Sequence, residues 1–172
     1  TFWGKGMNNF DLIVKGGTVS TASDTFKADI AVNGGRIVAL GEDLGTANQI
    51  VDAKNMTVLP GGIDSHCHIE QESSTRLMTA DDFFSGSVSA VFGGNTTFIP
   101  FAAQHRGQSL RDVIKIAHER AGPKSVIDYA FHLIISDPSE KVLGQELPAL
   151  IMEGYSSFKV YMTYELLKID DH

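Results

Sequence analysis

The chain has 172 residues, 42% of them hydrophobic and 20% charged, and it carries a formal net charge of −7. This ordinary globular balance argues against disorder, and the acidic charge argues against a nucleic-acid partner, whose phosphates require clustered Lys and Arg. No apolar run approaches the roughly 20 residues that span a bilayer, and no secretory signal pattern is recognisable. Cys67 is the single cysteine, so no internal disulfide can form. We therefore expect a soluble cytoplasmic protein with no membrane partner.

The first sixty residues have the texture of short strands. Residues 1–6 precede Met7, show no pattern and are predicted to be a leader or an expression scar. Residues 7–59 are predicted to form a small β-sheet unit, in which Asn33-Gly34-Gly35 marks a hairpin turn because these residues tolerate positive φ. The predicted strands are Leu12–Val14, which should stop at Gly16-Gly17, then Ala28–Val32, Arg36–Leu40, Gln49–Ala53 and Met56–Leu59.

After Pro60 the pattern changes to strands that alternate with helices. This alternation predicts right-handed βαβ units and a parallel sheet. A doubly wound sheet and a (β/α)8 barrel both satisfy it, and in either fold the catalytic groups belong at the carboxyl ends of the strands. The predicted strands are Thr57–His66, Thr96–Phe101, Val126–Ile135 and Tyr155–Met162.

Polar residues ahead of helical apolar patterns mark the starts of the intervening helices. Each start combines a capping side chain with an acidic residue just beyond it, and each end has a glycine. The predicted starts and ends are Thr79 and Asp82 with Gly93-Gly94, Ser109 and Asp112 with Gly122-Pro123, and Asp137-Pro138-Ser139-Glu140 with Gly154, the last helix restarting at Pro148.

Two histidines end the first strand after Pro60, in the stretch Gly61-Gly62-Ile63-Asp64-Ser65-His66-Cys67-His68. Because His66 and His68 are two residues apart, both rings project from the same face of an extended strand. Neutral imidazole is a common ligand of Zn, Fe, Ni or Mn. A bare His-x-His pair is more often exposed or hydrogen-bonded, but its position at the end of a βα strand favours a metal chelate. Cys67 points to the other face and is expected to pack.

Lys159 lies in the fourth strand, where an unpaired ammonium would be costly to bury. One alternative is a solvent-facing or ion-paired lysine on an edge, which the strand taken alone favours. The other is a lysine whose neutral amine has reacted with carbon dioxide. The resulting carbamate has two oxygens and can bridge two metals as a long carboxylate would.

Three stretches occur in the order Pro60-Gly61-Gly62-Ile63-Asp64-x-His66-x-His68, Phe92-Gly93-Gly94-x-Thr96-Thr97 and Ser157-Phe158-Lys159-Val160-Tyr161-Met162-x-Tyr164. In this order they resemble the dihydropyrimidinase and D-hydantoinase branch of the amidohydrolase superfamily. The similarity extends from about Phe10 to Asp171. The first and third stretches together are highly specific, whereas the second alone is weak.

The resemblance implies an α/β fold: the first half of a metal-dependent-hydrolase (β/α)8 barrel, preceded by a small β-sandwich segment. Residues 60–172 would then form an incomplete barrel of about four strands. By position, His66 and His68 would bind the more buried of two divalent metal ions, expected to be zinc. Lys159, carboxylated by carbon dioxide, would bridge both ions. Tyr164 matches the family tyrosine that hydrogen-bonds the carbonyl oxygen as it becomes an oxyanion, with a packed rim aromatic as the alternative.

The implied activity is hydrolysis of the cyclic amide bond of hydantoins or 5,6-dihydropyrimidines to N-carbamoyl amino acids, with a metal-bridging hydroxide as the nucleophile. The expected partners are a small cyclic ureide or imide substrate and further copies of the chain, because relatives are commonly tetramers. Two later His ligands and the acid–base Asp of the family have no counterpart here, so the chain alone is expected to be inactive. The other histidines do not fall at those places: His118 is expected to face solvent, His132 to be a core residue or to support the ligands, and His105 to line the mouth, while His172 has no assigned role.

Two other functions share parts of this pattern. Dihydroorotases usually place an Arg two residues after the second His, where it pairs with the substrate carboxylate, and Glu70 stands there in this chain. We therefore expect Glu70 to repel a carboxylate, which counts against dihydroorotase or allantoinase-like ring opening. Non-catalytic dihydropyrimidinase-related proteins lose ligand residues, whereas both His and the Lys are kept. Asn95 and the stretch Ile69–Ser74 depart from the family pattern, and the latter leaves the preferred ring substituent open.

Overall fold

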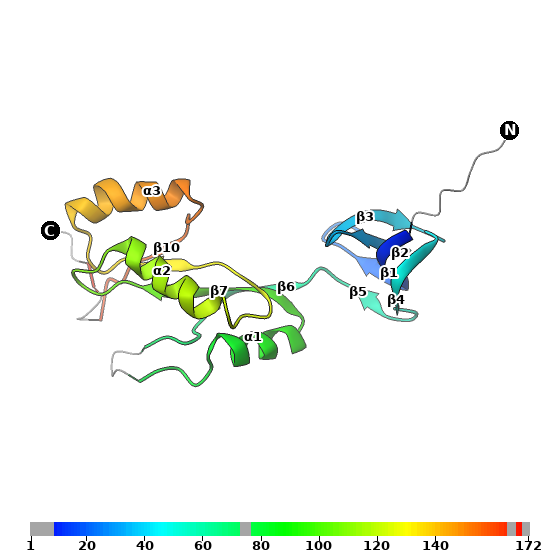
Figure 1. The fold of residues 1–172 in the computed structure, drawn as a ribbon, viewed down its shortest axis with the longest axis horizontal. Coiled ribbons are helices and arrows are strands. Elements are labelled where there is room, and N and C mark those ends of the chain that lie inside the picture. The colour runs from blue at the N-terminus through cyan, green and yellow to red at the C-terminus, as the bar shows by residue number, and fades with distance from the viewer. Residues whose placement is uncertain (1–8, 73–76, 165–167, 170–172) are drawn as a thin grey trace. The chain divides into compact units, whose positions relative to one another are not determined.

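The structure is a computed structural model that describes residues 9–72, 77–164 and 168–169 (Figure 1). The predicted leader, residues 1–6, lies outside these ranges. Contacts divide the chain into two compact units, Thr1–Pro60 and Gly61–His172. Each unit is built on its own β-sheet.

The first unit is a mixed sheet in which the central strand β1 pairs with three others. Strand β2 is antiparallel to both β1 and β3, whereas β4 and β5 run parallel to β1. Buried side chains gather in two clusters, one around Ile13 and one around Ile30. The strands are β1 Asn9–Ser20, β2 Thr25–Asn33, β3 Arg36–Gly41, β4 Thr46–Asp52 and β5 Thr57–Val58.

The glycines of this unit do two different things. The predicted hairpin is confirmed: Asn33 pairs with Arg36 across Gly34 and Gly35, whose φ values are 55° and 72°. The prediction that Gly16-Gly17 ends the first strand is wrong. Gly16 takes a φ of 75°, the register against β2 shifts between Val14 and Gly17, and β1 runs on to Ser20. A glycine at positive φ therefore makes a bulge here and does not end the strand.

The second unit is a parallel sheet whose strands follow one another in space in their sequence order, β6, β7, β9 and β10. Sequential order without a reversal is the arrangement of a barrel and not of a doubly wound sheet. The sheet is curled, so the predicted half-barrel preceded by a sandwich-like sheet is confirmed. The strands are β6 Gly62–Cys67, β7 Asn95–Ala103, β9 His132–Ile134 and β10 Phe158–Lys159, with β8 Asp128–Tyr129 also paired to β7.

Three barrel strands are shorter than predicted. Of the predicted strand Thr57–His66, Thr57–Val58 form β5, which pairs with β1 in the other sheet, and only β6 belongs to the barrel sheet. The predicted strand Val126–Ile135 is split into β8 and β9. Its first part pairs with β7 alone, whereas its second part pairs with β7 on one side and β10 on the other. The predicted strand Tyr155–Met162 is reduced to Phe158–Lys159, the two residues that pair with β9.

The helices of this unit are α1 Phe83–Phe92, α2 Leu110–Ala121 and α3 Leu147–Met152, with a π-helical turn at Val142–Glu146 leading into α3. Pro148 has no N–H and cannot bond the carbonyl four residues earlier, and the wider π turn lies directly before it. In the described part of the chain, no helix combines the length and apolarity needed to cross a membrane.

One predicted cap is right and two are wrong. The hydroxyl of Ser109 accepts the Arg111 N–H at 3.2 Å, as predicted for α2. The cap of α1 is Asp82, whose carboxylate accepts the N–H groups of Phe84 and Ser85, and not Thr79. Asp137 accepts the N–H of Gly107 in place of capping its own helix. Aspartate side chains serve turns and caps equally well, so sequence did not separate these roles.

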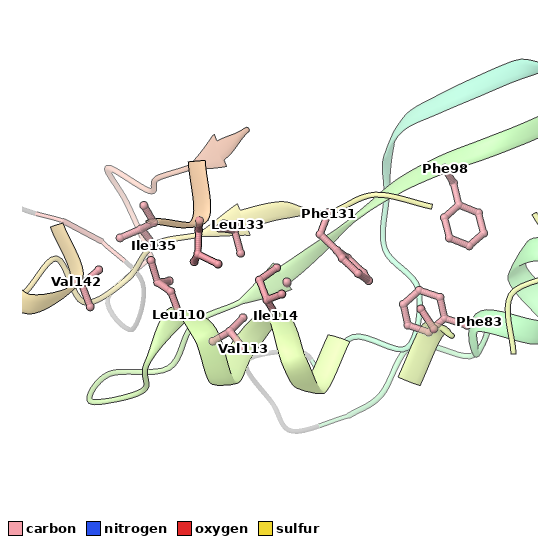
Figure 2. Close-up of a cluster of buried hydrophobic side chains, with 12 residues drawn as sticks. Phe83, Phe98, Leu110, Val113, Ile114, Phe131, Leu133, Ile135 and Val142 are labelled. Atoms are coloured by element: carbon pink, nitrogen blue, oxygen red, sulfur yellow. The ribbon is translucent and has the colours of Figure 1, made fainter. Parts of the chain in front are cut away.

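The core of the unit lies between the sheet and its helices (Figure 2). Phe98 and Ala102 of β7 and Leu133 of β9 belong to it. Since successive strand residues point to opposite faces, Phe101 and His132 face away from this core. The labelled members of the cluster are Phe83, Phe98, Leu110, Val113, Ile114, Phe131, Leu133, Ile135 and Val142.

Glu146 of the π turn has an almost fully buried carboxylate, which is hydrogen-bonded to the start of α2. Its Oε2 accepts the Leu110 N–H at 2.7 Å and the Ser109 hydroxyl at 3.1 Å, and its Oε1 pairs with Lys141 Nζ at 3.0 Å. Burial raises the pKa of Glu146, but the bonds from Lys141, Leu110 and Ser109 outweigh it and lower the pKa. This stabilisation is therefore present above the unfolded pKa and is lost as pH falls through the lowered folded pKa.

Replacing Glu146 with Ala should lower the free energy of unfolding by about 2 kcal/mol, because the buried Leu110 N–H loses its acceptor. Denaturant titration of the full-length protein measures the loss. The control is Glu153→Ala, since Glu153 is half-exposed, pairs with Arg111 at the surface and should cost less than about 1 kcal/mol. Equal losses in the two variants would contradict the role given to Glu146.

Candidate metal centre

The ring of Phe101 is surrounded by the side chains of the predicted metal ligands. Its centroid lies 4.9 Å from the His66 ring centroid and 5.0 Å from that of His68. Lys159 Nζ lies 4.1 Å from the same centroid, and the His132 ring lies 5.1 Å away. The structure therefore brings His66, His68 and Lys159 together on the face of the sheet that is turned away from the helix-packed core.

Strand register explains this convergence. Strand β7 is flanked by β6 and β9, and the register pairs Cys67 with Pro100, and His132 with Phe101. Strand β10 extends the ladder by pairing Lys159 with Ile134. Because the strands are parallel, their carboxyl ends meet at one edge, and residues far apart in sequence reach one ring.

The two histidine rings lie on the same side of β6, as predicted, with centroids 5.5 Å apart. His68 Nδ1 lies 2.7 Å from Gln71 Oε1. An amide oxygen only accepts, so Nδ1 carries the proton and the Nε2 lone pair is left for a metal ion. A partner of this kind on the second ring nitrogen is the usual arrangement around a ligating histidine.

Cys67 faces the opposite side and packs against the core, which confirms the prediction made for it. Burial, followed by the neighbouring Asp64 carboxylate, raises the pKa of the Cys67 thiol to about 11. The thiol therefore stays protonated at neutral pH, and a protonated thiol is a poor metal ligand.

Lys159 is half-buried and its Nζ lies over two aromatic rings, 4.1 Å from Phe101 and 5.0 Å from Tyr161. A cation over an aromatic face is stabilised by the ring quadrupole. None of the ion pairs among the described residues involves Lys159. An ion pair is therefore not found for Lys159 in this part of the chain, whereas the solvent-facing form of that alternative stays a prediction, because β10 is an edge strand of the described sheet.

Tyr164 is connected to Lys159 through the ring of Tyr161. Its ring contacts that of Tyr161 edge-on at 5.4 Å, and Tyr161 in turn contacts Lys159 Nζ. The side chain is 69% exposed and the backbone takes a φ of 61°, which a bulky residue rarely adopts. The role of Tyr164 toward a substrate oxygen stays a prediction.

The converging donors fit a divalent metal ion. Within residues 9–72, 77–164 and 168–169, no three His, Cys, Asp or Glu side chains meet as a metal site. The donors that do meet are two imidazoles and a lysine amine, which carboxylation would turn into an anionic oxygen donor. Imidazole nitrogen and carboxylate-type oxygen are a donor set that zinc accepts.

The other histidines take places that sequence only partly indicated. His118 on α2 is exposed, as predicted, but its Nε2 also lies 2.6 Å from the Tyr155 hydroxyl. His105 lines a cavity of about 160 Å³ together with Phe101 and Arg120, and its place at the mouth of the barrel stays a prediction. His172 lies outside the described residues.

The prediction that Glu70 repels a substrate carboxylate is wrong in its physical basis. Both Glu70 carboxylate oxygens accept from Lys124 Nζ, at 2.8 and 2.9 Å, and one accepts the Phe83 N–H. The Glu70 side chain is only 18% exposed, and its hydrogen bonds raise the pKa of Lys124, so Lys124 keeps its positive charge at neutral pH. Lys124 thus neutralises the charge of Glu70. The bonds of Glu70 to Lys124 and to the Phe83 N–H hold the loop that carries Gln71.

Two residues of this centre were missed by sequence reasoning, and a third, His132, was predicted only as a core or ligand-supporting residue. Phe101 was seen only as the end of a strand, and Gln71 only as part of a divergent loop. The two-sided hydrogen bonding of His132 was not foreseen. Only the position of Phe101 could have been predicted from sequence. It is three residues after Phe98 in the same strand, so its ring lies on the opposite face of the sheet.

No protein-family model matches the chain. A parallel half-barrel with a His-x-His pair after its first strand and a lysine in its fourth is nevertheless the arrangement expected of an amidohydrolase. The chain is 41% identical over 162 residues to the D-hydantoinase of Geobacillus stearothermophilus, covering 92% of this chain and 34% of that protein.

Solved structures give the same result. A structure of D-hydantoinase matches with a TM-score of 0.90 at 41% identity, covering 94% of this chain and 35% of that one. The dihydropyrimidinase of Brevibacillus agri NCHU1002 matches with a TM-score of 0.87 at 42% identity, covering 92% and 35%. The chain is homologous to the N-terminal portion of D-hydantoinases and dihydropyrimidinases, and spans about a third of the length of these relatives.

Proposed function

We propose that the protein containing this chain hydrolyses the cyclic amide bond of hydantoins or 5,6-dihydropyrimidines and releases N-carbamoyl amino acids. The observation that carries the proposal is the convergence of His66, His68 and Lys159 around Phe101. Relatives about 40% identical over most of this chain are named D-hydantoinase, which supports the same reaction class. The expected setting is a cytoplasmic homotetramer.

The chain's own residues have distinct roles in this reaction. His66 and His68 would hold one divalent ion through ring nitrogens, and Lys159 would be carboxylated when its neutral amine attacks carbon dioxide and loses a proton. Two bound divalent ions, expected to be zinc, would supply a hydroxide nucleophile near neutral pH and would polarise the amide carbonyl. Tyr164 would donate its phenolic hydrogen to the carbonyl oxygen as negative charge develops there.

The alternatives are less well supported. A dihydroorotase-like enzyme would be expected to carry Arg at position 70, where this chain has a glutamate engaged with Lys124. A non-catalytic relative would be expected to lose ligand residues, whereas His66, His68 and Lys159 are all present and close together.

The substrate ring should be neutral. Because position 70 offers no guanidinium, dihydrouracil or hydantoin should be turned over with a specificity constant at least about tenfold above that of dihydroorotate, equivalent to one missing charge-assisted hydrogen bond. Steady-state kinetics of the full-length protein on the three rings measures this ratio. Comparable constants for dihydroorotate and dihydrouracil would remove the preference for a neutral ring.

Lysine 159 should be essential. Lys159→Ala should lower kcat by more than about 100-fold. Losing a residue that only hydrogen-bonds a metal ligand already lowers metal affinity or activity about 10- to 100-fold, and Lys159 is itself a proposed ligand. Acetate should restore part of the activity by supplying a bridging carboxylate, and native mass spectrometry should show an extra carboxyl group on the wild-type chain only. Lys115→Ala, at an exposed position of α2, is the control. A fully active, metal-replete Lys159→Ala protein would exclude the role.

A polypeptide limited to residues 7–172 should have no activity. Ile63 of β6 is exposed, as are Val160 and Met162 just after β10, and a (β/α)8 barrel needs eight strands and about 250 residues. Expressed alone, this polypeptide should bind at most one divalent ion weakly and should tend to aggregate. Two tightly bound metal ions together with dihydropyrimidine hydrolysis would refute this expectation.

A further inference from the structure

His132 is hydrogen-bonded through both ring nitrogens to the two segments that carry the predicted ligands. Its Nε2 lies 2.8 Å from the carbonyl oxygen of Ser65, which directly precedes His66. Its Nδ1 lies 2.5 Å from the hydroxyl of Ser157, which is two residues before Lys159. One side chain on β9 therefore joins the end of β6 to the start of β10.

The chemistry of the partners fixes the direction of these bonds. A carbonyl oxygen only accepts, so Nε2 carries a hydrogen and donates it to Ser65. In the neutral imidazole Nδ1 then accepts from the Ser157 hydroxyl. With both nitrogens engaged, His132 has no lone pair for a metal ion, and it is a link between ligand strands and not a ligand itself.

The sheet does not supply this link by other means. Strands β6 and β10 are not neighbours, because β7 and β9 lie between them. Among the described residues, backbone bonds hold β10 only to β9, where the carbonyls of Ser157 and Lys159 accept at 3.0 Å. His132 reaches past the Phe101 ring of β7, 5.1 Å away, to the backbone of β6.

We infer that His132 is a positioning residue, which holds the end of β6 at a fixed separation from β10 so that His66 and Lys159 serve one metal centre. This inference rests on the proposed function. Partners that orient metal ligands are worth about 10- to 100-fold in metal affinity. The hydrogen bonds of His132 do not touch the ligand side chains themselves. They hold the Ser65 carbonyl next to His66 and the Ser157 hydroxyl two residues before Lys159.

Three variants of the full-length protein test the inference. His132→Phe keeps a ring against Phe101 but removes both hydrogen bonds, whereas His132→Gln keeps a donor and an acceptor on one amide. The matched control is His118→Phe, which removes a hydrogen-bonded histidine from α2, away from the ligands. The readouts are zinc affinity by chelator competition, carboxylation of Lys159 by native mass spectrometry, and the melting midpoint of the metal-free protein.

His132→Phe should lower zinc affinity about 10- to 100-fold and reduce carboxylation, while its metal-free midpoint matches that of His118→Phe. His132→Gln should recover most of the affinity. Wild-type affinity and carboxylation in His132→Phe would overturn the inference, as would a Gln variant no better than Phe. If His132→Phe melts well below the control, zinc affinity is measured on a further variant, Ser157→Ala. Weaker zinc binding of Ser157→Ala at an unchanged melting midpoint supports the link, and wild-type zinc binding overturns it.

A wild-type protein without zinc affinity would instead refute the proposed function itself, and the inference with it.

Discussion

Parallel pairing in sequence order is the constraint on which the candidate centre depends. Strands β6, β7, β9 and β10 each lie beside the next, so their carboxyl ends share one edge of the sheet. Alternation along each strand then divides the side chains between two faces. Phe98 and Leu133 meet the helices in the core (Figure 2), whereas Phe101 and His132 face the other way. A slip of one residue in β7 would exchange these two sets.

The same constraint explains a glycine ahead of the histidine pair. A Cβ on Gly61 would clash with the whole Thr96 side chain, including its Cβ at 2.7 Å, whereas one on Gly62 would meet only the end of the Asn95 side chain, which can move. The entry of β6 beside β7 therefore requires glycine at position 61. This glycine ahead of the two histidines is thus needed for packing. It sets where β6 begins and therefore where the rings of His66 and His68 lie.

Local chemistry made much of this predictable. The hairpin at Gly34-Gly35, the Ser109 cap and the same-face histidines follow from short-range rules that sequence displays directly. What escaped prediction depends on partners distant in sequence. Glu70 meets Lys124, and His132 meets both Ser65 and Ser157, and no local pattern announces such contacts. The alternation of strands and helices alone left the strand order open, and the family resemblance predicted the barrel order that the pairing confirms.

The central claim is that His66, His68 and Lys159 belong to one metal centre. An anomalous difference map of the full-length protein crystallised with zinc tests it most directly. We expect a peak about 2.0–2.1 Å from a ring nitrogen of both His66 and His68. Continuous density on Lys159 Nζ should reach the same peak as a carbamate oxygen. A zinc peak elsewhere, with no metal at these histidines, would contradict the account.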